Sequence, residues 1–187
     1  WVAGKKDNIL RGGFRDGNPL TFETTVRAQL SSIDLMSDSE LVPLRIDVNN
    51  HAQPAAAAYS PYGNHLILAM QGNNRLIVLD PFTGAEISRT STGRAPQSIL
   101  IDPATNRIFA KNFLSRSVSV FDGSTLLTTG SGALNLIAQP STVQNEQLSA
   151  TVLLGKQLFY DAADSRLAAD GYMSCASCHI NGEHDGR

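Results

Sequence analysis

The sequence has few cysteines, little net charge and no long apolar run, and each shortage excludes a class of protein. Two cysteines among 187 residues are too few for a disulfide-rich secreted scaffold. A net charge of -2 supplies no basic patch, so neither nucleic acid nor an anionic membrane is expected as a partner. No apolar run approaches the roughly 18 to 20 residues that a transmembrane helix needs, so no membrane span is expected.

The rest of the composition is ordinary for a soluble globular protein. Hydrophobic residues make up 42% of the chain and charged residues 17%, and the chain is long enough to bury a core. The sequence begins with Trp1 rather than methionine, and its start does not resemble a charged, apolar and cleavable export segment. We therefore expect a mature or excised piece of a longer protein.

Both cysteines lie in one short motif near the C-terminus. Residues 175–179 read Cys-Ala-Ser-Cys-His, and C-x-x-C-H is the attachment motif of a c-type haem. Two thiols at this spacing can each form a thioether to a vinyl group on one edge of the porphyrin, and the next side chain then lies under the iron. The motif predicts haem c attached to Cys175 and Cys178, with His179 as an axial iron ligand.

Three other interpretations of the motif stay open. A structural zinc site normally needs four ligands, and the chain has no second pair of cysteines. A thioredoxin-like C-x-x-C lies at a strand-to-helix junction, whereas the residues before Cys175 are not typical of a buried strand. A disulfide or two inert thiols is the simplest alternative. Haem is favoured over all three because His179 directly follows the second cysteine.

The second informative feature is an internal repeat. Four pairs of residues share a separation of 42 positions: Pro54 and Pro96, Pro61 and Pro103, Asn64 and Asn106, Asp80 and Asp122. The residues between them agree in character, since 75–80 read Arg-Leu-Ile-Val-Leu-Asp and 117–122 read Ser-Val-Ser-Val-Phe-Asp. A period of about 40 to 45 residues with several short strands is typical of a β-propeller blade.

Turn signals and β-rich runs predict the strands within each repeat. Ser-Pro at 60–61 and Asp-Pro at 102–103 begin type I turns. The small residues 55–58 suit an innermost strand beside a central channel, while 76–79 suit a strand buried on both faces. An earlier, blurred blade is expected in residues 1–49, with 29–35 and 42–48 as candidate strands.

These repeats, over about residues 50–135, resemble the YVTN-type β-propeller repeats of bacterial surface and periplasmic proteins. Those repeats carry a similar turn, Asp-Pro-x-Thr-Gly and Val-x-Val-Asp pattern. The resemblance implies an architecture and almost nothing about a ligand. A ring normally takes about 4 to 8 blades, and two to three blades cannot close it. We therefore expect a fragment, with a ring completed by other chains as the alternative.

The composition changes after the repeats. Gly, Ser, Asn, Gln and Pro predict a linker at 136–148. Ser149 can then cap a helix that ends near Asp161, with its apolar residues gathered on one side: Val152, Leu153, Leu154, Leu158 and Phe159. The predicted regions are a partial blade at 1–49, two repeats at 50–135, the linker, and the N-terminal part of a cytochrome c domain at 149–187. The fold class is multidomain: a partial all-β propeller followed by the start of an all-α c-type cytochrome domain.

The predicted helix and the haem motif form a longer pattern. Residues 154–161 read Leu-Gly-Lys-Gln-Leu-Phe-Tyr-Asp, and the match resumes from Ser174 to His179. This pattern resembles the opening of the bacterial di-haem cytochrome c peroxidase family, whose members share a Leu-Gly-Lys-x-Leu-Phe-x-Asp helix before their first haem motif. Where members usually show Leu-Ser soon after the aspartate, this chain has Asp164 and Ser165.

The resemblance implies thioether bonds at Cys175 and Cys178 and proximal iron ligation by His179, and it assigns no catalytic residue. In that family the first haem reduces peroxide and a second haem takes electrons from a donor protein. The implied function is an exported haem c oxidoreductase in the periplasm or on the bacterial cell surface. Its expected partners are hydrogen peroxide and an electron-donor protein or small redox carrier. The alternative is a propeller-based surface binding protein whose haem is only an electron relay.

Other polar residues are not predicted to reach the iron. Met173 and His184 lie too close in sequence to His179 to reach the opposite face of the ring, so neither is a good sixth ligand. Residues 183–185 are expected to form a solvated turn; the alternative is a polar rim or a contact that supports the ligating histidine. The remaining candidates are expected to be ordinary surface or strand residues: His51, His65, Lys156 and Arg166.

Overall fold

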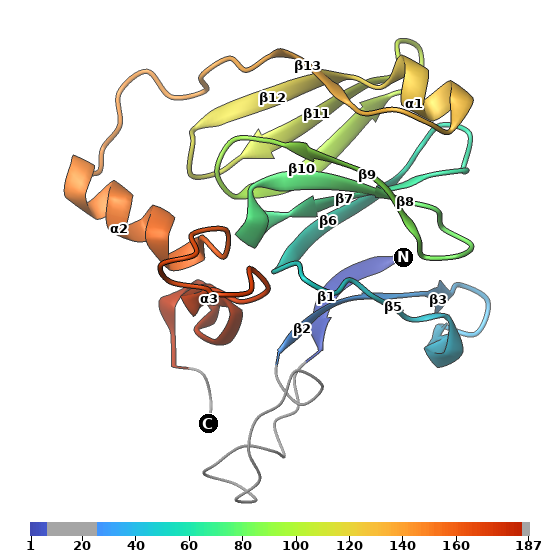
Figure 1. Cartoon of the computed structure of the whole chain (residues 1–187), viewed down its shortest axis with the longest axis horizontal. Coiled ribbons are helices and arrows are strands. Elements are labelled where there is room, and N and C mark those ends of the chain that lie inside the picture. The colour runs from blue at the N-terminus through green and yellow to red at the C-terminus, as the bar shows by residue number, and fades with distance from the viewer. Residues whose placement is uncertain (7–25, 185–187) are drawn as a thin grey trace, which may run out of the picture.

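A computed structural model describes residues 1–6 and 26–184 of the chain, and these residues form three main antiparallel sheets and a two-stranded hairpin, followed by a small helical segment. Figure 1 shows the sheets side by side, with the helical segment at one end of them. The observed class is therefore a partial β-propeller joined to a helical C-terminal region, as the sequence predicts. Among the described residues, no helix is long and apolar enough to cross a membrane.

The first sheet is only partly as expected. Its strand order is β1 (Val2–Lys6), β2 (Arg27–Ser31) and β5 (Ile46–Asp47), with a small hairpin of β3 (Ile33–Asp34) and β4 (Ser39–Glu40) beside it. The predicted strand at 29–35 is split between β2 and β3. The predicted strand at 42–48 is wrong in its first half, because Val42–Leu44 form a 3-10 turn with Pro43 at its start. Proline has no N–H to donate to a strand ladder, which favours the turn.

The next two sheets each have four strands in sequence order. One contains β6 (Pro54–Tyr59), β7 (Leu66–Met70), β8 (Arg75–Leu79) and β9 (Glu86–Ser91), and the other contains β10 (Pro96–Asp102), β11 (Arg107–Asn112), β12 (Ser117–Asp122) and β13 (Asn135–Ala138). A short helix, α1 (Ser124–Thr129), precedes β13. Residues 136–138, predicted as the start of the linker, are therefore part of the fourth strand of the last sheet.

The two central strands of the middle sheet, β7 and β8, are buried on both faces because alternate side chains of a strand point in opposite directions. On β7, Ile67 and Ala69 pack into a core shared with the last sheet, while Leu66, Leu68 and Met70 pack into a core shared with the first sheet. The side chains of β8 divide in the same way. This alternation confirms the predicted double-sided burial of 76–79.

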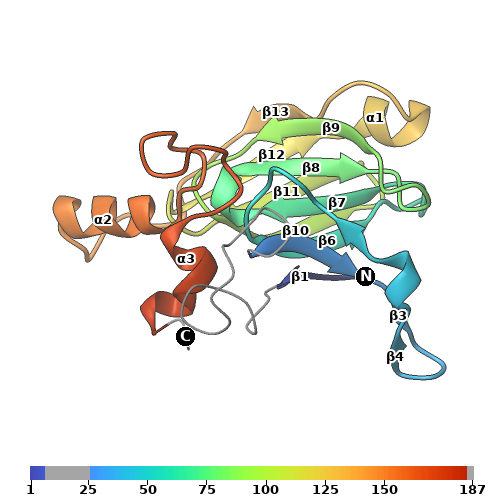
Figure 2. The same cartoon turned by 60° about the horizontal axis from the view of Figure 1, so that its bottom comes forward.

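The first strands of the three sheets lie together. β6 contacts both β1 and β10, and Figure 2 shows these three strands on the same side of the molecule. Residues 55–58 of β6 are all alanine, and their small side chains permit this close approach. The position of β6 at the edge of its sheet and against its neighbours is that expected of an innermost strand.

His51 and His65 were expected at the surface or on strands, but both side chains are almost fully buried. The Nε2 atom of His51 lies 3.0 Å from a carboxylate oxygen of Glu86. Burial is the largest influence on both imidazoles and lowers the pKa of His51 and of His65 from the usual value. For His51, the hydrogen bond with Glu86 opposes that shift. The sequence gives no sign of this burial, because each histidine lies next to a turn rather than inside a strand.

Buried neutral histidines make the stability of the protein depend on pH. Because the folded pKa of each is lower, the unfolded chain binds more protons once the pH falls below about 6.5, the unfolded value. We expect the free energy of unfolding to be highest above pH 7 and to decrease as the pH falls below 6.5.

Urea unfolding at pH 7.5 and 5.5 measures this decrease. The free energy of unfolding should fall less between the two pH values in the double variant His51→Asn, His65→Asn than in the parent protein. The exposed His184→Gln is the control, and equal losses in the double variant and the parent would contradict the assignment.

Candidate haem-attachment site

The helix before the motif begins and ends where the sequence predicts. It is α2 (Ala150–Tyr160), and the Ser149 side chain caps it by accepting a hydrogen bond from the Val152 N–H. Its apolar residues are not gathered on one side, however. Val152 and Leu154 are 55% and 51% exposed, so the helix presents apolar side chains to solvent as well as to the rest of the fold.

The two cysteines form the ends of a single helical turn, α3 (Cys175–Cys178). The Ser177 hydroxyl stabilises its start by accepting a hydrogen bond from the Ser174 N–H at 3.0 Å. Residues three apart in a helix lie on the same face, so both thiols point from one side of the turn. Both are free, with Cys175 exposed and Cys178 partly exposed.

His179 follows α3 directly, and its ring is oriented by the backbone. Its Nδ1 atom lies 3.0 Å from the carbonyl oxygen of Glu183. A carbonyl oxygen only accepts, so Nδ1 is the donor in this contact, and in the neutral imidazole Nε2 is then the nitrogen that can ligate a metal. A ligating histidine commonly donates its other N–H in this way. The 183–185 segment thus provides a supporting contact through the Glu183 main chain, while Asp185 lies outside the described residues.

A cavity of about 330 Å³ lies beside the motif. It is partly open to solvent and is lined by the end of α2 and by residues 167–175, among them Leu158, Met173 and Cys175. Near it, Leu167 and Ile180 remain largely exposed. Two free thiols on one turn, an imidazole with Nε2 available and exposed apolar side chains form a donor set and surroundings that fit a covalently attached haem. Within the described ranges, no three His, Cys, Asp or Glu side chains are grouped as a metal site.

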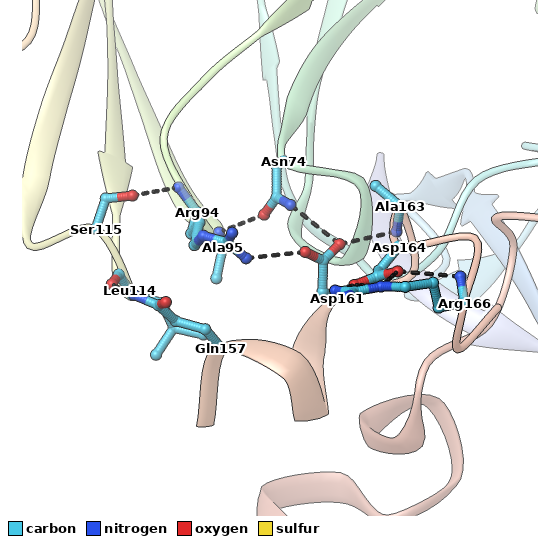
Figure 3. A network of polar contacts seen from close by, with 10 residues as sticks. All are labelled: Asn74, Arg94, Ala95, Leu114, Ser115, Gln157, Asp161, Ala163, Asp164 and Arg166. Carbon is cyan, nitrogen blue, oxygen red and sulfur yellow. Dashed lines mark hydrogen bonds and ion pairs between the residues drawn. The ribbon is translucent and has the colours of Figure 1, made fainter. Parts of the chain in front are cut away.

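The helical segment is bonded to the sheets through Asp161, the residue that follows α2. Figure 3 shows its carboxylate between Asn74 and Arg94. The Asn74 amide donates to it at 3.2 Å, and the Arg94 guanidinium at 2.9 Å. In the sequence, Asp161 belongs to the family pattern but has no predicted partner. A role for Asn74 and Arg94 is not predicted, because their contacts with Asp161 join positions 87 and 67 residues apart.

Lys156 and Arg166 were both expected to be ordinary surface charges. The ammonium of Lys156 lies 4.6 Å from the centre of the Phe113 ring, a cation–π contact between α2 and the last sheet. Arg166 is exposed and pairs with Asp164 at 2.6 Å. This pairing, mainly through the hydrogen bonds from Arg166, lowers the pKa of Asp164 to about 2. Arg166 is thus a surface residue as expected, whereas Lys156 joins two parts of the fold.

Comparison with known families gives one match. Residues 149–186 match the family described as di-haem cytochrome c peroxidase. The matched segment contains α2, the loop after it and the C-x-x-C-H motif. At a coarse level, this supports a haem c peroxidase-like oxidoreductase in that part of the chain. A search of curated proteins found no match.

Solved structures resemble the sheet region. A β-propeller domain of Cps50 (Swd1) from Myceliophteria thermophila is 15% identical with a TM-score of 0.50, covering 62% of this chain and 38% of its own. A candidate 6-phosphogluconolactonase from Bacteroides fragilis is 13% identical with a TM-score of 0.50, covering 62% and 35%. Hydrazine synthase from Kuenenia stuttgartiensis is 16% identical with a TM-score of 0.48, covering 61% and 31%. At these identities the two structures with a TM-score of 0.50 show the propeller fold alone. The chain spans about a third of the length of each of the three structures.

Proposed function

We propose that this chain is part of an exported c-type haem oxidoreductase, in which Cys175 and Cys178 bind haem c and His179 ligates its iron. The observation that carries the proposal is the arrangement of α3, where two free thiols on one helical turn precede an imidazole whose Nδ1 bonds to the Glu183 carbonyl. The family match at residues 149–186 adds support. We place the protein in the periplasm or on the bacterial cell surface, because covalent attachment to C-x-x-C-H implies exported, reduced apoprotein.

A haem held in this way supplies one-electron transfer and, where its other axial position is open, reduction of hydrogen peroxide. The residues of the chain position that chemistry. The cysteines fix the ring, and the carbonyl of Glu183 fixes the tautomer and plane of His179. Leu158 and Met173 line the adjoining cavity and can exclude water from it. The proposed partners are hydrogen peroxide and an electron-donor protein or small redox carrier.

Covalent attachment is tested by removing the thiols. In the full-length exported protein, the pyridine haemochrome spectrum should show the band position of a haem with two thioethers. Each single change, Cys175→Ser or Cys178→Ser, should shift the band to that of one thioether. The double change should leave no haem on the protein after denaturation. A parent protein without covalent haem, or a double variant that keeps it, would refute the attachment.

Peroxide reduction is tested on the haem-loaded, full-length protein. We expect turnover of hydrogen peroxide with a reduced donor, and a haem that is five-coordinate in at least one redox state by electron paramagnetic resonance and absorption. If every haem is six-coordinate in all states and no turnover occurs, the peroxidase part is wrong. The haem would then act as an electron relay for a binding propeller.

A further inference from the structure

We propose that the turn between β7 and β8 and the loop before β10 form a seat that positions the loop 161–174, which leads into the haem motif. Three residues of the sheets carry the seat: Asn73, Asn74 and Arg94. They hold the loop at its start and near its end. The inference rests on the proposed function for the role of the motif, but the contacts themselves are independent of haem.

The start of the loop is held through Asp161, which is 8% exposed. Its Oδ1 atom accepts from Asn74, and its Oδ2 atom pairs with Arg94 at 2.9 Å. The side-chain oxygen of Asn74 in turn accepts from the Ala95 N–H at 2.9 Å. Asn74 therefore bridges Asp161 to the beginning of the next sheet. Because the carboxylate is buried, its partners matter more than those of an exposed ion pair.

The residue after Asp161 is fixed by the backbone of the same turn. The Ala162 N–H donates to the Gly72 carbonyl at 2.7 Å, and Ala162 is fully buried. A side chain on Gly72 would not fit, since its Cβ would lie 2.7 Å from the Cβ of Ala52 and 3.4 Å from that of Ala162. The overlap is with Ala52, so the glycine lets the turn pack against the segment before β6, and Ala162 then lies at ordinary contact distance from the same turn.

The end of the loop is held by Asn73, whose side chain is buried. Its amide donates to the Gly171 carbonyl at 2.6 Å, and its oxygen accepts from the Ala52 N–H at 2.5 Å. Asn74 has a positive φ of 56°, a conformation that asparagine tolerates better than most residues. Two adjacent asparagines thus reach both ends of one loop.

The other sheets add contacts close to the motif itself. The Lys5 ammonium, from β1, donates to the Ser177 carbonyl of α3 at 2.9 Å. Gln157 of α2 donates to the Leu114 carbonyl of the last sheet at 2.9 Å. Each of the three sheets therefore bonds to the helical segment, which restricts its movement as a unit.

The corresponding turn of the last sheet holds a different segment. At the 42-residue spacing, Ser115 and Arg116 occupy the places of Asn73 and Asn74. Arg116 pairs with Glu146 at 2.8 Å, and its carbonyl accepts from the Thr142 N–H at 2.7 Å. Equivalent turns of two sheets thus contact two successive parts of the C-terminal chain, the loop 161–174 and residues 142–146. The side chains at the two turn positions differ between the sheets.

The test uses the full-length, haem-loaded protein. Arg94→Met removes the charge of a half-exposed residue, Asn74→Ala removes the bridge, and Arg94→Lys keeps the charge. Asp164→Asn is the matched control, because Asp164 bonds to Arg166 within the loop. Hydrogen–deuterium exchange of residues 162–178 should be about 10-fold faster in Arg94→Met and Asn74→Ala. It should be largely restored in Arg94→Lys. In Asp164→Asn it should be unchanged outside the Arg166 amide, which donates to the Asp164 side chain.

A second readout distinguishes positioning from general stability. The electron paramagnetic resonance spectrum of the haem should broaden in Arg94→Met and return to the parent form in Arg94→Lys. Parent-like exchange in both Arg94→Met and Asn74→Ala would overturn the seat even if the haem content is normal. If the parent protein carries no covalent haem, the proposed function fails, and the exchange rates of the same variants still decide whether the seat exists.

Discussion

Replacing His179 with glycine should leave the haem covalently attached but change its iron coordination. The thioethers depend on Cys175 and Cys178, whereas the axial nitrogen comes from His179 alone in the proposed arrangement. Loss of this ligand should shift the absorption maximum and move the midpoint potential by on the order of 100 mV or more, because axial ligands set haem potentials over about 0.8 V. Added imidazole should restore the spectrum by entering the vacated position.

The matched control for this change is His184→Gln, which alters an exposed histidine on the same short segment. It should leave the spectrum and potential as in the parent protein. Two outcomes would contradict the assignment. An unchanged spectrum in His179→Gly would mean that another group ligates the iron, and a changed spectrum in His184→Gln would point to His184 as a ligand.

Phe121→Ala should produce the largest loss of stability among core substitutions. Phe121 on β12 is 0% exposed and is among the largest fully buried side chains. It packs in the core that joins the last two sheets, with partners such as Ile67 and Leu76 on the middle sheet. Truncating a buried phenylalanine costs about 3 to 5 kcal/mol, which is a large part of a typical total of about 5 to 15 kcal/mol.

The effect of Phe121→Ala is measured by the midpoint of urea unfolding, with the slope of the transition checked for constancy. Phe82→Ala is the control, because Phe82 lies in the turn after β8 and is 86% exposed. Phe82→Ala should change the free energy of unfolding by no more than about 0.5 kcal/mol. A loss below about 1 kcal/mol for Phe121→Ala would mean that the side chain does not fill the core between the sheets.

Much of the fold could be predicted because it depends on local pattern. The proline turns and alternating apolar residues of 50–135 predict the strands of two sheets, and the residues of β8 are buried on both faces as expected. The predicted boundaries of strands were wrong where one residue type in a segment favoured a different local structure from its neighbours. Proline at 43 changed a predicted strand into a turn. Residues 136–138 of β13 (Asn135–Ala138) were predicted as linker because the surrounding composition is rich in Gly, Ser, Asn, Gln and Pro.

In the candidate site, too, the features that depend on neighbouring residues could be predicted from the sequence, and those that depend on distant residues could not. The C-x-x-C-H motif places two thiols and an imidazole next to one another through spacing alone, and the Ser149 cap could be read from the residues that follow it. The partners of Asp161 could not. Asn74 lies in the turn between β7 and β8 and Arg94 in the loop before β10, and both come close to Asp161 only when the helical segment packs against the sheets. One weak indication of a special role for this turn was present in the sequence. Asn73 and Asn74 are not repeated 42 residues later, where Ser115 and Arg116 stand.

The sequence by itself determined the short-range features of this protein: the strands and turns of the blades, the capped helix, and the spacing of Cys175, Cys178 and His179. These follow from backbone preference and from residues a few positions apart. The tertiary structure alone decided that His51 and His65 are buried and how the sheets hold the segment before the motif. Such contacts join residues distant in the chain, and they form only when apolar burial brings the sheets and the helical segment together.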